Sequence, residues 1–252
     1  MDFSIDDIER ARRRLEGVVK PTPLIGSATL ARMLEAEVLL KPENLQKTGS
    51  FKLRGAYNRI AALSSDEARR GVIAASAGNH GQALAYAASH AGVEATVVMP
   101  RTAAIAKIDA TRSYGQNVVL EGVDYQEAHR AAEAICAHRG ALFVDAYDDP
   151  FVIAGQGTIG LEIADESAPD VVLVPVGGGG LIAGIAVAIA ARVPHAEVVA
   201  VEAAGSPQLS ASLAANGPAS LGRPSIRSPT ASRQAESAGS RSSLSARMCA
   251  AS

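Results

Sequence analysis

Short apolar runs alternate with longer helix-like segments along most of the chain. From residue 38 onward, runs rich in Val and Ile are separated by Ala-rich segments of helical length, which is the pattern of strand–helix–strand units. This pattern predicts strands at residues 38–40, 72–75, 95–99, 118–120, 142–144, 171–174 and 198–201. It predicts helices at residues 54–63, 79–91, 103–113, 125–138, 156–163 and 181–191.

The strands are almost continuously apolar, which is typical of sheets that are covered on both faces. We therefore expect an α/β fold with mostly parallel sheets flanked by helices. Such sheets bind ligands at the carboxyl ends of their strands. The turns that lead from a strand into a helix are therefore the first places to look for chemistry.

The C-terminal part of the sequence differs from everything before it. From about Ser206 to Ser252 the chain is rich in Ser, Arg, Ala, Gly and Pro and shows neither the helical nor the strand period. Such a composition favours a poorly ordered tail. One interpretation is a disordered linker; the other, which we favour, is that a frame change or truncation has replaced the natural C-terminal segment.

Composition and charge exclude several classes of partner. The 252 residues, 48% of them hydrophobic, suffice for one large or two modest domains. A formal charge of -2 gives no broad positive field for nucleic acid. Cys136 and Cys249 have no ligand-like spacing, so we expect no disulfide framework and no metal site.

From the N-terminal residues and the apolar runs, we expect neither a secretory signal nor a membrane span. The N-terminus, MDFSIDDIERARRRLEG, lacks the basic start and apolar run of a secretory signal. The longest apolar stretch, at 181–191, is too short to span a bilayer. We therefore expect a cytoplasmic protein without a membrane segment.

The first candidate motif surrounds Lys52 in KPENLQKTGSFKLRGAYNRI, residues 41–60. Lys52 follows Phe51 at the start of a predicted helix, where desolvation and the helix N-terminus both lower a lysine pKa and so make a nucleophile. Residues 48–50, Thr-Gly-Ser, supply a turn and an N-cap. Spacing alone leaves open that Lys52 is an ordinary surface lysine.

The second motif is VIAASAGNHGQALAYAA, residues 72–88. Ser76, Gly78 and Asn79 lie in a turn between a strand and a helix, where backbone N–H groups can bind an anion or a carboxylate. An ordinary Ser or Asn helix cap explains the same residues. His80, alone in the first helical turn, is more often structural than catalytic.

The third motif is VVLVPVGGGGLIAGIA, residues 171–186. Four consecutive glycines end a strand and begin a helix, so their N–H groups can surround a phosphate. The motif lacks the Walker Lys-Ser/Thr pair and the G-x-G-x-x-G spacing, which disfavours ATP and dinucleotides. A merely flexible turn is the alternative. Together the three motifs supply a lysine nucleophile, a carboxylate site and a phosphate site, the equipment for an aldehyde phosphate cofactor and an amino acid.

These motifs carry a resemblance to a known family. SFKLRGA around Lys52, SAGNHGQ around Asn79, GGGGL at 177–181 and VIAGQGTIGLEI at 152–163 closely resemble the fold-type II pyridoxal-phosphate (PLP) enzymes, in particular threonine and serine dehydratases. The resemblance covers about residues 10–205.

The resemblance implies a role for each matching residue. Lys52 would hold PLP as a Schiff base and later act as the catalytic base, Phe51 would pack near the ring, and Asn79 would bind its phenolic oxygen. The phosphate would be bound by Gly177, Gly178, Gly179, Gly180 and Leu181. Ser76, with Asn79 and the neighbouring backbone, would bind the substrate carboxylate. The reaction would be elimination of the β-hydroxyl from L-threonine or L-serine, which yields a 2-oxo acid and ammonia.

The resemblance also implies a domain organisation and a metabolic role. Residues 1–68 and 148–205 would form a large PLP-binding domain, residues 69–147 a small mobile domain, and 206–252 an atypical tail. The enzyme would be a homo-oligomer that takes part in isoleucine biosynthesis. The family's Ser or Thr at the pyridine nitrogen is not recognisable after Ser206. Glu202 follows a strand where related enzymes carry a cation ligand, but no carboxylate partner accompanies it.

Three alternative functions are weaker. A serine racemase of this family carries a serine directly after the position of Ser76, and here that residue is Ala77, which has no proton to give. A β-replacement enzyme of the cysteine-synthase type has different lysine and asparagine motifs. A non-catalytic remnant, which binds PLP or pairs with other subunits without turnover, is the alternative from another class.

Overall fold

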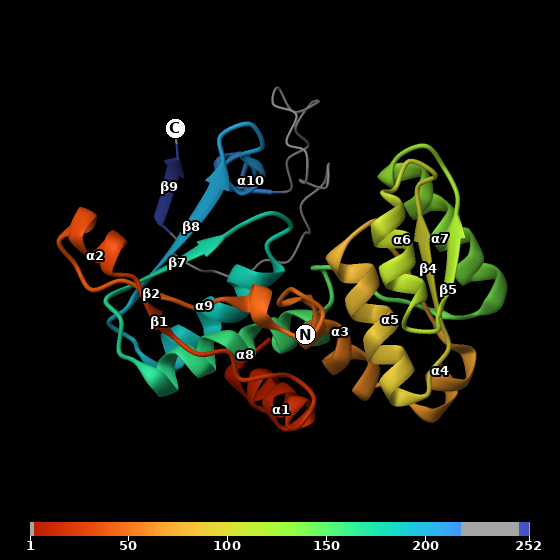
Figure 1. Cartoon of the computed structure of the whole chain (residues 1–252), viewed down its shortest axis with the longest axis horizontal. Helices are drawn as coiled ribbons and strands as arrows, with labels where there is room; N and C mark the ends of the chain where they lie inside the picture. The colour runs from red at the N-terminus through yellow and green to blue at the C-terminus, as the bar shows by residue number, and fades with distance from the viewer. Residues whose placement is uncertain (1–2, 218–246, 252) are drawn as a thin grey trace.

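The fold is built around two separate parallel sheets, as Figure 1 shows. The structure is a computed structural model, and it describes residues 3–217 and 247–251. Before the first parallel strand come α1 (Ile5–Leu15), β1 (Ile25–Gly26), α2 (Ala28–Leu34), β2 (Leu39–Leu40), the 3-10 helix η1 (Glu43–Leu45), α3 (Lys52–Ala61) and α4 (Ser65–Arg70). Strands β1 and β2 pair antiparallel.

The first parallel sheet has four strands in the order β5-β4-β3-β6. Its elements are β3 (Val72–Ala75), α5 (Asn79–Ala91), β4 (Ala95–Met99), α6 (Ile105–Arg112), β5 (Asn117–Leu120), α7 (Tyr125–Arg139) and β6 (Leu142–Phe143). Val72 and Ala74 of β3 share a core cluster with α5 residues, whereas Ile73 and Ala75 pack with α7 residues. Because helices cover both faces, every residue of β3 is buried, which explains its continuous apolar sequence.

The second parallel sheet has three strands in the order β7-β8-β9. Its elements are α8 (Pro150–Glu166), β7 (Val171–Pro175), α9 (Gly180–Arg192), β8 (Glu197–Ala203), α10 (Gln208–Ala214) and β9 (Arg247–Ala251). Val172 and Val174 face the apolar sides of α8 and α9. Val171 and Leu173 on the other face are 49% and 65% exposed, so the expected covering of both faces is incomplete here.

Helices α3, α8 and α9 pack with their backbones in close approach because glycines lie at the crossings. A Cβ added at Gly155 of α8 would lie 2.6 Å from the Cα of Gly55 in α3. A Cβ added at Gly184 of α9 would lie 2.6 Å from the backbone nitrogen of Gly157 in α8. No real Cβ tolerates such distances, so the glycines set the separation of the three helices.

The predicted elements are found with small differences at their ends. Strands 72–75 and 95–99 and helix 79–91 have the predicted bounds. Helix α8 begins at Pro150, six residues before the predicted start at 156, because Asp149 caps it through the backbone nitrogens of Phe151 and Val152 and proline suits the first turn. None of the described helices is long and apolar enough to cross a membrane.

The C-terminal region also differs from the expectation of an irregular tail. Residues 208–214 form α10, and residues 247–251 pair with β8 in parallel register. The Glu202 carboxylate accepts hydrogen bonds from the backbone nitrogens of Leu209 and Ser210, at 2.6 and 2.9 Å. In the described part of the chain no group of three His, Cys, Asp or Glu residues is placed to hold a metal ion. The expectation of disorder also covers residues 218–246 and 252, which are outside the residues that the structure describes.

We expect Gly155→Ala to lower the free energy of unfolding by about 1–3 kcal/mol, the usual range for overpacking a close contact. The higher helix propensity of alanine, which favours it over glycine by about 1 kcal/mol, offsets part of this loss. Chemical denaturation measures the change. Gly26→Ala is the control, since no atom lies within 4 Å of an added Cβ there; equal stability of both variants would contradict the packing argument.

Candidate active site

Lys52 is the first residue of α3, and its ammonium group points away from bulk water. Its Nζ donates a hydrogen bond to the backbone oxygen of Ala146 at 2.6 Å and lies 5.2 Å from the centroid of the Phe51 ring. Desolvation by burial lowers the pKa of Lys52 from 10.5 to about 8, although the charge of Asp145 partly opposes this shift. A lysine with this pKa is partly neutral near physiological pH and is therefore a competent nucleophile and base.

The start of α3 differs from the predicted cap. The N-cap is Phe51, without a capping side chain, and Gly49 adopts a φ of 72° in the turn before it. The predicted cap by Thr48 or Ser50 was therefore wrong. Instead, the hydroxyl oxygens of both residues are buried without a hydrogen-bond partner among the described residues, which leaves two polar atoms beside the Lys52 helix for a ligand.

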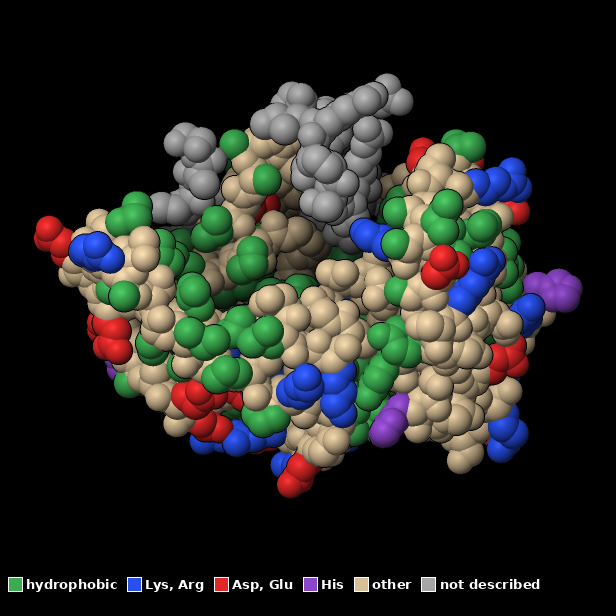
Figure 2. All heavy atoms as spheres, in the orientation of Figure 1, with side chains coloured by type: hydrophobic (Ala, Val, Ile, Leu, Met, Phe, Trp, Pro, Cys, Tyr) green, Lys and Arg blue, Asp and Glu red, His purple; other side chains and the backbone are tan. Residues whose placement is uncertain are grey.

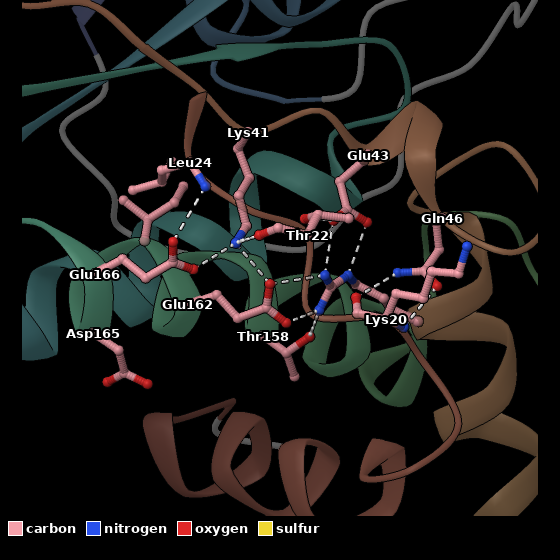
Figure 3. A network of polar contacts seen from close by, with 12 residues as sticks. Lys20, Thr22, Leu24, Lys41, Glu43, Gln46, Thr158, Glu162, Asp165 and Glu166 are labelled. Carbon is pink, nitrogen blue, oxygen red and sulfur yellow. Dashed lines mark hydrogen bonds and ion pairs between the residues drawn. The ribbon is translucent and has the colours of Figure 1, made fainter. Parts of the chain in front are cut away.

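A buried arginine fixes α3 to its surroundings. Arg54, two residues after Lys52, pairs with Glu43 at 2.7 Å and with Glu162 at 2.5 Å. Figure 3 shows this network, in which Lys41 adds a second cation at 2.8 Å from Glu162. Burial alone lowers the pKa of Arg54, but its hydrogen bonds to Glu43 and Glu162 raise that pKa above the ordinary value. The network joins η1, α3 and α8, and so positions the helix that presents Lys52.

One short connection touches all three predicted motifs; we call residues 144–149 the crossing segment. Its Val144 backbone oxygen contacts His80 Nε2 at 3.0 Å, and its Ala146 oxygen accepts from Lys52. Tyr147 lies against the glycine loop: a Cβ added at Gly180 would lie 2.6 Å from the Tyr147 backbone oxygen. The crossing segment therefore brings the lysine, α5 and glycine motifs into one place.

The segment itself is held by Asp145. The carboxylate oxygen Oδ1 of Asp145 accepts hydrogen bonds from the backbone nitrogens of Tyr147 and Asp148, both at 2.8 Å. Sequence reasoning missed Asp145 and Tyr147. The available signal was DAYDD, a polar run directly after the predicted strand 142–144, at a carboxyl end where parallel sheets place their ligands.

The second motif forms the N-terminus of α5, as predicted. Ser76 is buried, and its hydroxyl oxygen accepts hydrogen bonds from the backbone nitrogens of Gly78 and Gly81, at 3.2 and 3.0 Å. Asn79 is the first residue of α5 and is exposed, and the N-cap Gly78 has no side chain to cap the helix. The Ser76 hydroxyl thus caps the start of α5, which is the alternative that the sequence left open for this motif.

His80 is a neutral imidazole in this turn. Burial, together with the charge of Lys52, lowers the pKa of His80 to about 4. Because its Nε2 faces the Val144 carbonyl oxygen, this nitrogen carries the hydrogen. Its Nδ1 is then an acceptor, buried without a partner in the described part of the chain.

The glycine loop connects β7 to α9. Gly179 is the N-cap of α9 with a φ of 88°, a left-handed conformation that favours glycine. Gly178 has no room for a side chain, since an added Cβ would lie 2.8 Å from Cδ2 of Tyr147 and closer still to other atoms of the ring. Gly177 and Gly180 complete the loop, and the next residue, Leu181, packs with Phe51 against one hydrophobic cluster. Figure 2 shows the surface hollowed between the part that carries β4 and β5 and the part that carries β7 and β8.

The comparisons with known proteins agree with this geometry. Residues 15–248 match the family described as pyridoxal-phosphate dependent enzyme. An L-threonine ammonia-lyase from Thermotoga maritima is 53% identical over 213 residues, which are 84% of this chain and 53% of the relative. The chain thus spans about half the length of this curated relative.

Two solved structures extend the comparison. The processed form of threonine deaminase isoform 2 from Solanum lycopersicum superposes with a TM-score of 0.83 at 38% identity, over 86% of this chain and 64% of that one. Serine racemase from Dictyostelium discoideum superposes with a TM-score of 0.82 at 34% identity, over 86% and 71% of the two chains. This chain belongs to the family of pyridoxal-phosphate dependent enzymes. Its α/β fold and its cofactor class are those expected from the motifs.

The chemistry of the site fits PLP on observations of this chain alone. A lysine with a lowered pKa is available for the aldehyde, and a glycine loop opens the N-terminus of α9 to a phosphate. The unpartnered oxygens of Thr48 and Ser50 and the Nδ1 of His80 lie around the lysine helix and α5.

We expect the reactivity of Lys52 toward PLP to rise with pH around a midpoint near 8. Its ammonium form dominates below that pKa and its nucleophilic neutral form above it. Peptide mapping after borohydride trapping, carried out over a pH series on the cofactor-free protein, measures the rate. The exposed Lys47 is the internal reference, and coincident midpoints for the two lysines would refute the desolvation argument.

Proposed function

We propose that this protein deaminates L-threonine to 2-oxobutanoate and ammonia, and L-serine to pyruvate and ammonia. The observation that carries the proposal is the partly neutral Lys52, held by the crossing segment between an anion site at α5 and a glycine loop at α9. The names of the 53% identical L-threonine ammonia-lyase and of the threonine deaminase with the same fold support it.

Residues of this chain would hold the aldehyde, the ring face, the phenolic oxygen and the phosphate of the cofactor. Lys52 Nζ would hold PLP covalently, and Phe51 would lie beside its ring. Asn79 would bind the phenolic oxygen. The backbone of Gly177, Gly178, Gly179, Gly180 and Leu181 would bind the phosphate, where the α9 dipole favours negative charge. When bound, PLP supplies an electron sink for the charge that develops at the substrate Cα.

The remaining chemistry is done by side chains and backbone of this chain. The turn with Ser76 at the N-terminus of α5 binds the substrate carboxylate and so orients the Cα–H bond. Lys52, once its amine is released, takes the Cα proton at Nζ, and a pKa of about 8 suits a base that works near neutral pH. The β-hydroxyl would take up a proton and leave as water, and the released aminocrotonate or aminoacrylate would then be hydrolysed by water to the 2-oxo acid and ammonia.

The organisation of the whole protein is part of the same proposal. We assign residues 1–68 and 148–205 to a large domain and residues 69–147 to a small mobile domain, which is supported by the two separate parallel sheets. A homo-oligomer, a cytoplasmic location and a role in isoleucine biosynthesis complete the proposal. A substrate amino acid is the expected partner, rather than nucleic acid or a membrane.

Racemisation is the second candidate function, because serine racemase shares the fold. A racemase needs a proton donor on the face opposite the lysine. The residue after Ser76 is Ala77, whose methyl group cannot donate a proton. This favours elimination. A non-catalytic remnant is the remaining alternative, and the first experiment below separates it from an enzyme.

We expect Lys52→Ala to abolish both the absorbance of lysine-bound PLP and the release of 2-oxo acid from L-threonine, because the covalent anchor and the base are lost together. The visible spectrum and a coupled 2-oxo acid assay measure the two effects, and circular dichroism checks the fold. Lys47→Ala, which removes an exposed lysine five residues away, is the control. If the phosphopyridoxyl group were mapped to Lys41, Lys47 or Lys107, the assignment would be wrong.

We expect Ala77→Ser to add racemisation of L-serine to the elimination reaction, because the new hydroxyl supplies a proton opposite Lys52. Chiral chromatography of the recovered serine measures the D-isomer. Ala77→Val, which adds bulk without a transferable proton, is the matched control for side-chain size. If Ala77→Ser gave no more D-serine than Ala77→Val, the proposal that residue 77 and Lys52 lie on opposite faces of the bound substrate would be wrong.

A further inference from the structure

Helix α6 brings a second lysine to the turn at the N-terminus of α5. The side chain of Lys107 is partly buried, and its Nζ lies 3.6 Å from the position that a Cβ would take at Gly78, the N-cap of α5. Helices α5 and α6 pack next to each other against the four-stranded sheet. Lys107 therefore lies beside the proposed carboxylate site, although it is 55 positions away from Lys52 in the sequence.

The ammonium of Lys107 lacks a compensating charge in the part of the chain that the structure describes. No described carboxylate lies within 4.0 Å of its Nζ, and no hydrogen bond satisfies it. Lys41 shows the contrast, because it pairs with Glu162 and Glu166 at 2.8 and 3.1 Å. The N-terminus of α5 carries a partial positive charge of its own, equivalent to roughly half an elementary charge. Two positive groups side by side favour an anion between them.

Side chains within and before α5 also bear on what this turn can bind. His80, the second residue of α5, is 4% exposed and keeps Nδ1 buried without a hydrogen-bond partner among the described residues; as an acceptor, this nitrogen can bind a donor group of a ligand but not its carboxylate. Ser76 is also buried, and its hydroxyl already accepts two backbone hydrogen bonds, so its own proton remains available to a ligand oxygen. For a carboxylate, the turn thus offers the Ser76 hydroxyl proton and the ammonium of Lys107, which has no counter-ion among the described residues.

We propose that Lys107 is a specificity-determining residue that binds the substrate carboxylate together with the N-terminus of α5. The proposal rests on the function proposed above and deepens it. One carboxylate oxygen accepts from the α5 turn and Ser76, and the other from the Lys107 ammonium. The site therefore selects amino acids with a free carboxylate over their esters and amino alcohols, because only the carboxylate compensates the two positive groups.

The kinetic test compares Lys107→Gln with Arg112→Gln. Both changes remove one positive charge from α6, but exposed Arg112 lies five positions later and about 140° around the helix. We expect Lys107→Gln to raise KM for L-threonine about tenfold or more, the usual effect of losing a charged hydrogen bond, with kcat changed less than about threefold. Lys107→Arg should restore part of the affinity. Equal KM values for Lys107→Gln and Arg112→Gln would overturn the proposal.

A binding test does not depend on turnover. Acetylation of each lysine by an N-hydroxysuccinimide ester is measured by mass spectrometry in the presence of L-alanine or L-alanine methyl ester, neither of which has a β-hydroxyl to eliminate. L-alanine should protect Lys107 and its methyl ester should not, relative to exposed Lys47. Equal acetylation of Lys107 with both compounds would overturn the proposal. If the protein neither holds PLP on Lys52 nor releases 2-oxo acid, the proposed function fails, while protection of Lys107 by L-alanine would still support the carboxylate site.

Discussion

The ion pairs of Arg54 are the interaction on which the arrangement of the active site depends. Its guanidinium is fully buried and is held by Glu43 on one side and Glu162 on the other. A charge removed from water in this way is tolerated only while its partners stay in place, and loss of one partner typically costs about 3–5 kcal/mol. Arg54 lies about half a helical turn after Lys52 on α3. An orientation of α3 that keeps both ion pairs of Arg54 therefore also fixes the direction of the Lys52 side chain. A structural ion pair and a catalytic group are thus coupled through α3.

Close backbone packing supplies the second constraint. Gly55, Gly155 and Gly184 let α3, α8 and α9 approach until a single methyl group would collide with a neighbouring backbone. The same principle operates at the glycine loop, where Tyr147 of the crossing segment occupies the space that a side chain at Gly178 would need. Glycine in these places therefore serves packing, and at the glycine loop this packing role accompanies the proposed binding of phosphate.

The fold gives three lysines three different electrostatic settings. Lys41 is compensated by two carboxylates, which makes it part of a structural network. Lys52 is desolvated with a carbonyl oxygen as its hydrogen-bond acceptor, and its pKa falls to about 8. Lys107 faces a helix N-terminus without a described counter-ion. Desolvation, pairing and helix dipoles thus separate the structural role of Lys41 from the catalytic role proposed for Lys52 and the binding role proposed for Lys107.

The sequence by itself determined the order of strands and helices from β3 to β8, the α/β class and the three motifs, because these depend on local periodicity and on turn chemistry within a few residues. Residues 72–75, 95–99 and 79–91 were predicted with their observed bounds for this reason. Only the tertiary structure decided that Asp145 and Tyr147 belong to the site, that Thr48 and Ser50 do not cap α3, and that Lys107 lies beside Gly78. Desolvation and charge compensation depend on segments far apart in the sequence, and no local pattern records which of them meet.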